Sequence, residues 1–191
     1  MNKEQILKNY ENAKNTPSDI NEHVETLFNL AKEVEHITEM GVRNVVSTWA
    51  FMLRDPKKLI GIDIHTNENV EAAKLIYPKW EFIEGDTLIV NIKKTDLLFI
   101  DTLHIYTQLK NELNKHAKNV KKYIVLHDTT TYGHTDEPTS WQTPEIMSNY
   151  KIDDNKRGLK PALEEFLATN EDWYIFKEYT NNNGLTILKR K

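Results

Sequence analysis

The sequence contains no cysteine, which excludes disulfides, thiolate metal sites and cysteine nucleophiles. Its six glycines and six prolines form no repeat and no linker-like cluster, so we expect one domain over residues 1–191. No apolar run approaches the length of a membrane span, and the polar first residues lead into no apolar segment typical of a secretion signal. We therefore expect a cytoplasmic protein with no membrane partner.

An excess of positive charge is also missing. The chain carries 25 basic and 29 acidic residues, for a net charge of −4, and they are spread along the sequence. This distribution offers no footprint for a phosphate backbone, so we expect no nucleic-acid partner. Hydrophobic residues make up 39% and charged residues 28%, as in globular proteins in general, and a homo-oligomer is compatible with these features.

Short apolar runs alternate with segments of helical periodicity, a pattern typical of βαβ units and a parallel sheet. The first 35 residues are expected to be helical. The predicted strands are 36–42, 58–64, 81–84, 96–100, 123–127, 173–179 and 185–189. The predicted later helices are 47–54, 69–77, 106–119 and 159–168. The Asn-Asn-Asn-Gly run at 181–184 predicts a hairpin, so we expect a mostly parallel, Rossmann-like α/β sheet that ends in an antiparallel pair.

A polar stretch at residues 133–158 interrupts this alternation. It is longer than ordinary connections between elements, and we interpret it as a lid or mobile loop. An aromatic residue in such a stretch, Trp141, is a candidate lid contact to a substrate.

Acidic residues lie at or near the carboxyl ends of five predicted strands. In open α/β sheets ligands bind outside the carboxyl ends of the strands, so these residues are candidates for ligand contact. An acidic residue can also cap the helix that follows a strand, and for each residue alone this alternative stays open. The five residues are Glu39, Asp63, Asp86, Asp101 and Asp128.

Asp63 lies twenty-two residues after Gly41, a spacing at which a carboxylate can accept hydrogen bonds from the hydroxyls of an adenosine ribose. The turn that begins at Gly41 has one glycine where a dinucleotide site would have three, and Arg43 and Val46 add bulk there. S-adenosylmethionine has no phosphate and needs less of that space. An NAD(P)-dependent oxidoreductase or epimerase of Rossmann type is the alternative, because the same spacing fits that class.

The segment after the fourth predicted strand carries Asp101 and His104, and the next strand ends in His127 and Asp128. Asp101 and Asp128 could meet across the sheet and form an oxygen-rich site suited to Mg²⁺. A metal there would lower the pKa of a substrate hydroxyl, and His104 could take its proton during transfer of a methyl group. The alternative is that His104 caps or packs against the helix that begins near it.

The chain resembles the class I S-adenosylmethionine-dependent methyltransferases. It is most similar to the branch that includes cephalosporin hydroxylase-like proteins and metal-dependent sugar and macrolide O-methyltransferases. The resemblance spans roughly residues 20 to 190. It is carried by residues 37–42 with 47–48, 59–63, 82–86, 99–101 with His104 and Tyr106, 124–129, 158–162 and 183–186.

The resemblance implies a doubly wound, seven-stranded sheet that ends in the antiparallel hairpin. It also implies that the first turn holds the methionine part of the cofactor, Asp63 the ribose, and Asp86 with Thr87 the adenine. The expected cofactor contacts are Glu39, Gly41, Ser47, Thr48, Asp63, Ile64, Asp86, Thr87 and Asp101. The expected metal ligands are Asp101 and Asp128, with His127 as the third candidate, and the expected catalytic residues are His104, as the base, and Asp101.

The leading hypothesis is therefore an S-adenosylmethionine-dependent O-methyltransferase, assisted by Mg²⁺, that acts on a hydroxyl group of a small molecule. A sugar or glycosylated metabolite is the expected acceptor class. A third alternative is a non-catalytic, methyltransferase-like binding module.

Overall fold

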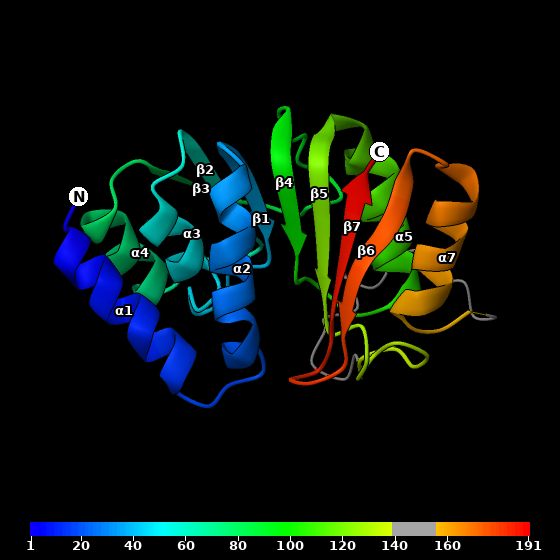
Figure 1. Cartoon of the computed structure of the whole chain (residues 1–191), viewed down its shortest axis with the longest axis horizontal. Helices are drawn as coiled ribbons and strands as arrows, with labels where there is room; N and C mark the ends of the chain where they lie inside the picture. Colours follow the sequence, from blue (N-terminus) through cyan, green and yellow to red (C-terminus); the bar gives the residue numbers. More distant parts are fainter. Residues whose placement is uncertain (139–155) are drawn as a thin grey trace.

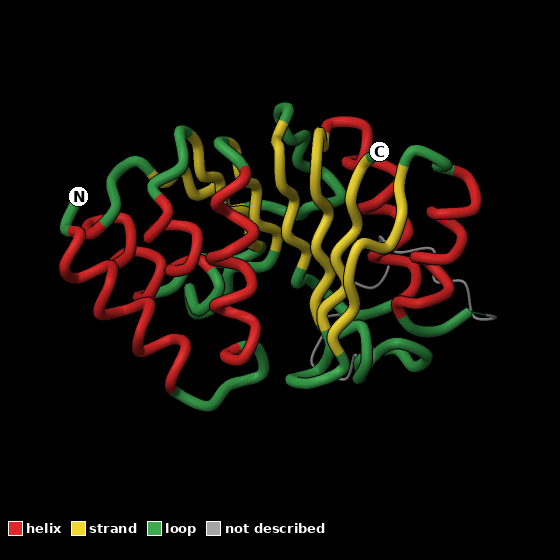
Figure 2. The backbone as a smooth tube through the Cα atoms, viewed as in Figure 1, coloured by secondary structure: helices red, strands yellow, loops and turns green. Residues whose placement is uncertain are grey.

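The computed structural model describes residues 1–138 and 156–191. Within these residues the chain forms a seven-stranded sheet with the order β3-β2-β1-β4-β5-β7-β6 (Figures 1 and 2). The strands are β1 His36–Met40, β2 Lys58–Asp63, β3 Trp80–Glu84, β4 Thr95–Ile100, β5 Val120–His127, β6 Trp173–Tyr179 and β7 Leu185–Arg190. The first five pair in parallel, and β7 pairs antiparallel with both β5 and β6. The predicted fold class is confirmed.

Helices cover both faces of the sheet. The α-helices are α1 Lys3–Asn15, α2 Val24–Leu30, α3 Thr48–Arg54, α4 Glu68–Ile76, α5 Tyr106–His116 and α7 Leu159–Thr169. Short 3-10 turns are η1 Asn21–His23, η2 Ala31–Glu33 and η3 Ala117–Asn119. Figure 1 shows α1 to α4 on one side of the sheet and α5 and α7 on the other. Among the described residues, no helix is long and apolar enough to cross a membrane.

The central strands are apolar along their whole length because each is buried on both faces. In β4, Leu97 and Phe99 join the core beneath α1, α2 and α3, whereas Leu98 and Ile100 join the core beneath α5 and α7. Successive side chains of a strand point to opposite faces, so one run of residues serves two cores. Burying each of these side chains stabilises the fold by roughly 1.5–3 kcal/mol.

The sheet order changes direction between β1 and β4, because the chain crosses from β1 to β2 on one side and reaches β4 on the other. Gly41 after β1 donates its N–H to Ile62 O, and Asp101 after β4 donates to Met40 O. The ends of β1, β2 and β4 are thereby held at one level. Such a switch point is where open α/β sheets bind ligands.

The predicted hairpin is present at the carboxyl terminus. The turn between β6 and β7 has positive φ at Asn182, Asn183 and Gly184, which these residue types tolerate better than others. Some predicted boundaries were wrong. The strand β1 ends at Met40, two residues before its predicted end, and β5 begins at Val120, three residues before its predicted start.

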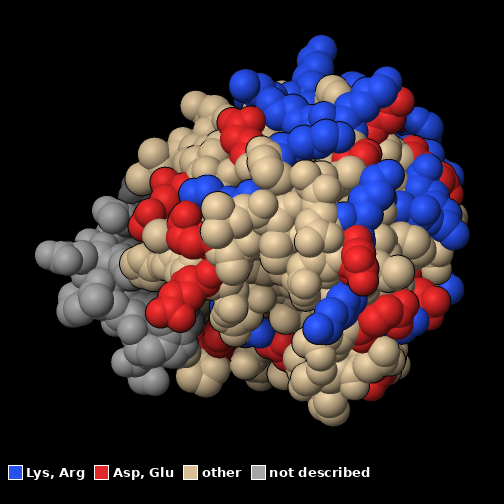
Figure 3. All heavy atoms as spheres, turned by 90° about the vertical axis from the view of Figure 1, so that its left-hand side faces the viewer, with Lys and Arg blue, Asp and Glu red and all other residues tan. Residues whose placement is uncertain are grey.

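Lysine and arginine side chains gather at the top of the molecule in Figure 3. Figure 3 is turned from Figure 1 about the vertical axis, so the same end of the molecule is at the top of both. In Figure 1 the parallel strands begin at this end and run downward. Lys58 lies at the start of β2, and Lys121 and Lys122 lie near the start of β5. The acidic residues at the carboxyl ends of the strands therefore lie at the opposite end of the strands from these lysines.

Candidate functional site

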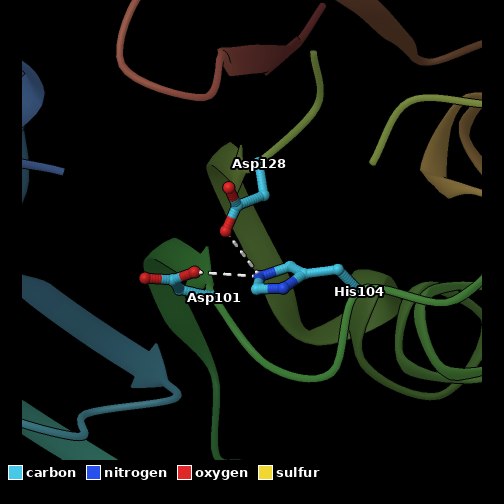
Figure 4. A group of neighbouring side chains, drawn as sticks. All are labelled: Asp101, His104 and Asp128. Atoms are coloured by element: carbon cyan, nitrogen blue, oxygen red, sulfur yellow. Dashed lines mark hydrogen bonds and ion pairs between the residues drawn. The ribbon is translucent and has the colours of Figure 1, made fainter. Parts of the chain in front are cut away.

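Asp101, His104 and Asp128 converge at the carboxyl ends of β4 and β5 (Figure 4). Nε2 of His104 lies 3.1 Å from Asp101 Oδ1 and 2.9 Å from Asp128 Oδ2. The two carboxylates come together because β4 and β5 are parallel neighbours, so their ends meet at one edge of the sheet. One ligand atom from each of the three residues lies within 4.8 Å of the others, a spacing that could hold a metal ion.

His127, the last residue of β5, lies beneath this group and is fully buried. Its Nδ1 is 3.1 Å from Asp101 Oδ1 and 3.2 Å from Asp128 Oδ2, and its Nε2 is 3.3 Å from Asn182 O. The structure thus places the predicted third ligand against both carboxylates. The group with metal-ligand spacing, however, consists of Asp101, His104 and Asp128.

The two histidines and the two carboxylates stabilise each other's charges. Burial alone would lower the pKa of His127, but the adjacent Asp101 and Asp128 raise it to about 10. Burial also opposes the charge of His104, yet Asp101, Asp128 and Glu137 hold its pKa well above the usual range. The pKa of Asp101 is lowered, because the histidines outweigh its burial. Each histidine therefore favours the charged form of the carboxylates, and each carboxylate favours the charged form of the histidines.

Glu137 is a site residue that the sequence did not indicate. Its Oε2 lies 3.0 Å from His104 Nδ1 and accepts a hydrogen bond from the His104 backbone N–H at 3.2 Å. Tyr132 stacks on the His104 ring, with the ring centroids 5.2 Å apart. Both residues follow β5 in a stretch that matches no motif. The lid predicted for residues 133–158 lies mostly outside the described residues, and so does Trp141.

Asp128 has two features typical of a ligand-binding residue. Its backbone has a φ of 59°, a conformation that is uncommon for non-glycine residues and, where it occurs, is often found at active sites and ligand clamps. Its Oδ1 is buried, with no hydrogen-bond partner in the described structure. An unpaired buried carboxylate oxygen is costly, and a bound cation would satisfy it.

The first turn, between β1 and α3, brings together the four residues predicted there. Glu39 is fully buried, and Ser47 donates a hydrogen bond to its Oε1 at 2.5 Å. Burial raises the pKa of Glu39 to about 8 despite this bond, so the carboxyl group is protonated at neutral pH. Its Oε2 has no partner among the described residues. Thr48 is also fully buried, as the first residue of α3.

Gly41 is required by the close approach of two chain segments. Its φ is 82°, and a Cβ at this position would lie 1.9 Å from the carbonyl oxygen of Asp101. The backbone of the first turn is therefore packed directly against the backbone of Asp101 and Thr102. Arg43 and Val45, further along the turn, also have positive φ, at 44° and 67°. This is a strained conformation for a β-branched residue such as Val45.

Asp63 lies at the end of β2 beside the first turn. Its Oδ2 accepts hydrogen bonds from the backbone N–H groups of Val42 and Arg43, each at 2.8 Å. Its Oδ1 accepts a longer bond of 3.3 Å from His65 N. The carboxylate thus holds the turn in place and keeps acceptor capacity on Oδ1. Ile64 exposes 43% of its surface beside it, as an apolar contact for a ligand would.

Asp86 and Thr87 follow β3. Asp86 Oδ1 accepts a hydrogen bond of 2.7 Å from Leu88 N, which shapes the loop. Thr87 is buried and donates its hydroxyl to Glu112 Oε1 at 2.5 Å. Glu112, on α5, is a second residue that the sequence did not indicate, and it ties this loop to the segment that follows Asp101.

No protein-family model matches the chain, and no curated protein matches it. Its fold is similar to several solved structures. A candidate caffeoyl-CoA O-methyltransferase from Staphylococcus aureus is 15% identical, with 98% of this chain and 91% of that chain covered and a TM-score of 0.64. The methyltransferase PaMTH1 from Podospora anserina, bound to S-adenosylhomocysteine, is 15% identical, with 97% and 87% covered and a TM-score of 0.62.

The N-methyltransferase NodS from Bradyrhizobium japonicum WM9, in complex with S-adenosylhomocysteine, is 13% identical, with 98% and 97% covered and a TM-score of 0.61. One of these proteins is named an O-methyltransferase and another an N-methyltransferase, and all three are at most 15% identical to the chain, so the likeness concerns the fold. The resemblance to class I S-adenosylmethionine-dependent methyltransferases is thereby confirmed at the level of the fold.

Proposed function

We propose that the chain is an S-adenosylmethionine-dependent O-methyltransferase that acts on a hydroxyl group of a small molecule, with a sugar or glycosylated metabolite as the acceptor class and Mg²⁺ as the metal. The observation that carries the proposal is the convergence of Asp101, His104 and Asp128 beside the first turn. Asp101, which follows β4, places this group beside the switch point of a fold shared with methyltransferases whose structures contain S-adenosylhomocysteine.

The residues around the first turn fit the cofactor. Glu39 and Gly41, with Ser47 and Thr48, would face the methionine part, and Glu39 Oε2 is a buried oxygen with no hydrogen-bond partner among the described residues. Asp63 Oδ1 would accept from the ribose, beside Ile64. Asp86 and Thr87 would face the adenine. The bulk of Arg43 and Val46 beside Gly41 disfavours a pyrophosphate, and with it the nicotinamide alternative.

The residues at the ends of β4 and β5 fit a divalent cation. Asp101 and Asp128 supply the carboxylate oxygens that Mg²⁺ prefers, and Asp128 Oδ1 is buried and unpaired within the described structure. If the nitrogen of His104 or His127 also served as a ligand, Mn²⁺ or Zn²⁺ would suit the site better than Mg²⁺. Comparing these ions in a binding assay therefore tests whether the histidines are ligands.

S-adenosylmethionine supplies an electrophilic methyl group, and a divalent cation lowers the pKa of a bound hydroxyl. Glu137 accepts from His104 at Nδ1, which fixes the tautomer whose Nε2 can take the proton of the acceptor hydroxyl. His104 can act as this base only when neutral, so the charges of Asp101 and Asp128 must then be compensated by a cation. The remaining contribution of the site is to orient the acceptor oxygen toward the methyl group.

Isothermal titration calorimetry with S-adenosylhomocysteine and with Mg²⁺ tests the proposal. The wild-type chain should bind S-adenosylhomocysteine, and Asp128→Asn should weaken Mg²⁺ binding, whereas Glu171→Gln, an exposed control, should change neither. Tight NADH binding without affinity for S-adenosylhomocysteine would instead favour the oxidoreductase. Binding of neither cofactor would leave the non-catalytic module as the better description.

A further inference from the structure

Glu112 is a buried acidic residue at the centre of a polar cluster. It lies on α5 and exposes none of its surface. Its Oε1 accepts hydrogen bonds from Thr87 Oγ1 at 2.5 Å and from Gln108 Nε2 at 2.7 Å, and each of its oxygens lies 2.9 Å from Thr102 Oγ1. Gln108 Nε2 also donates to Thr87 Oγ1 at 3.1 Å. One carboxyl group thus joins three polar side chains inside the protein.

The two threonines come from different parts of the site. Thr87 follows β3 and is the neighbour of Asp86, the residue proposed to face the adenine. Thr102 follows β4 and is the neighbour of Asp101, a proposed metal ligand. Glu112 therefore connects the adenine-side loop, residues 85–94, to the metal-side segment, residues 101–104.

The adenine-side loop depends on α5 for its position. Residues 85–94 contain no helix or strand in the structure. Side chains of α5 hold their backbone: His116 Nε2 lies 2.8 Å from Thr87 O, and Lys115 Nζ donates to Leu88 O at 2.8 Å. Glu112 bonds both to this loop, through Thr87, and to the metal-side segment, through Thr102.

The need to fill space inside the protein does not explain why residue 112 is acidic. Burial raises the pKa of Glu112 to about 7, with a further contribution from Asp86, although the bonds from Thr87, Gln108 and Thr102 oppose the rise. A leucine would fill a similar space without the cost of burying a polar group. What a leucine could not do is accept hydrogen bonds from the hydroxyls of Thr87 and Thr102 at once.

We propose that Glu112 is a positioning residue that fixes the adenine-side loop relative to the metal-side segment, and thereby couples the binding of an adenosyl ligand to the binding of a divalent cation. The coupling rests on the methyltransferase function proposed above. The positioning itself rests only on the hydrogen bonds of the free protein.

The coupling is measured as the ratio of the S-adenosylhomocysteine dissociation constants without and with saturating Mg²⁺. We expect this ratio to differ from one by about fivefold or more in the wild type. It should approach one in Glu112→Leu, and also in Thr102→Val, which removes only the hydroxyl that links Glu112 to the metal-side segment. Glu112→Gln keeps one acceptor oxygen, so its ratio should lie between that of Glu112→Leu and that of the wild type. Asn114→Ala, an exposed change on the same helix, is the matched control and should behave as the wild type.

Hydrogen exchange of the free protein tests the positioning without any ligand. Glu112→Leu and Thr102→Val should speed exchange of the backbone amides at 85–90 and 101–105 together, relative to Asn114→Ala. If the wild type binds S-adenosylhomocysteine but these variants leave both the ratio and the exchange unchanged, the role of Glu112 is refuted and the methyltransferase proposal stands. If the wild type binds no S-adenosylhomocysteine, the proposed function and the coupling fail, and the exchange experiment alone decides the positioning.

Discussion

Replacing Glu39 by glutamine should change how the stability of the protein depends on pH. Glu39 is fully buried at the end of β1, and burial raises the pKa of its carboxyl from 4.5 to about 8. Each unit of such a shift corresponds to about 1.4 kcal/mol, so the difference in proton affinity between the folded and unfolded chain is worth roughly 5 kcal/mol. Glutamine has nearly the same shape and can still accept the hydrogen bond from Ser47, but it does not titrate.

The sign of the effect follows from the proton balance. Between the unfolded pKa of 4.5 and the folded pKa of about 8, the folded protein holds a proton that the unfolded chain has lost. Unfolding then releases a proton, so the free energy of unfolding falls as the pH rises through this window. Glu112, whose pKa is raised to about 7, contributes in the same direction over a narrower range. The comparison of Glu39→Gln with the wild type cancels that second contribution.

Urea denaturation of both proteins at about pH 5 and at about pH 8 measures the effect. The stability gained by Glu39→Gln over the wild type should increase by on the order of 4 kcal/mol between these two values. Glu171→Gln, which changes an exposed carboxylate, should show no such increase. Parallel pH profiles for the wild type and Glu39→Gln would refute the conclusion that the carboxyl group is buried in its neutral form.

Four further variants test two glycines of the turns and the side chain of Asp63. Gly41→Ala should lower the free energy of unfolding by about 2–4 kcal/mol in urea denaturation, because the new Cβ meets Asp101 O and φ is positive. Gly184→Ala should be destabilising by a similar amount in the same assay, since its Cβ would lie 2.5 Å from Thr130 N. In calorimetry, Asp63→Ala should abolish S-adenosylhomocysteine binding, whereas Asp63→Asn, which keeps an acceptor oxygen for the turn, should weaken it about tenfold. Unchanged binding in both Asp63 variants would contradict the role of this residue.

Much of the fold was predictable because it depends on local patterns. Apolar runs of strand length, each with an acidic residue at or near its carboxyl end, located the strands of the parallel sheet. Since the carboxyl ends of neighbouring parallel strands meet, the same runs predicted that Asp101 and Asp128 lie close together, as the structure shows. The Asn-Asn-Asn-Gly run predicted the hairpin, because its residues tolerate positive φ.

The contacts made by buried polar side chains could not be predicted in this way. The predicted helix 106–119 shows an apolar face at Tyr106, Leu109, Leu113 and Ala117, but Gln108, Glu112 and His116 are buried as well. They are covered because the loop of residues 85–94 packs along that side of the helix, an arrangement with no local signal. Glu137 was missed for a related reason, since it reaches His104 across thirty-three residues of sequence.

The first turn shows how one carboxylate can replace the usual sequence signal of a site. A glycine-rich turn allows positive φ because glycine has no Cβ, but here Arg43 and Val45 adopt positive φ with full side chains. Asp63 offsets that cost by accepting the backbone N–H groups of Val42 and Arg43 on a single oxygen. The turn is therefore shaped by a residue of the next strand. Because Asp63 would both shape the turn and bind the ribose, loss of binding in Asp63→Ala alone cannot separate the two roles, whereas the contrast with Asp63→Asn can.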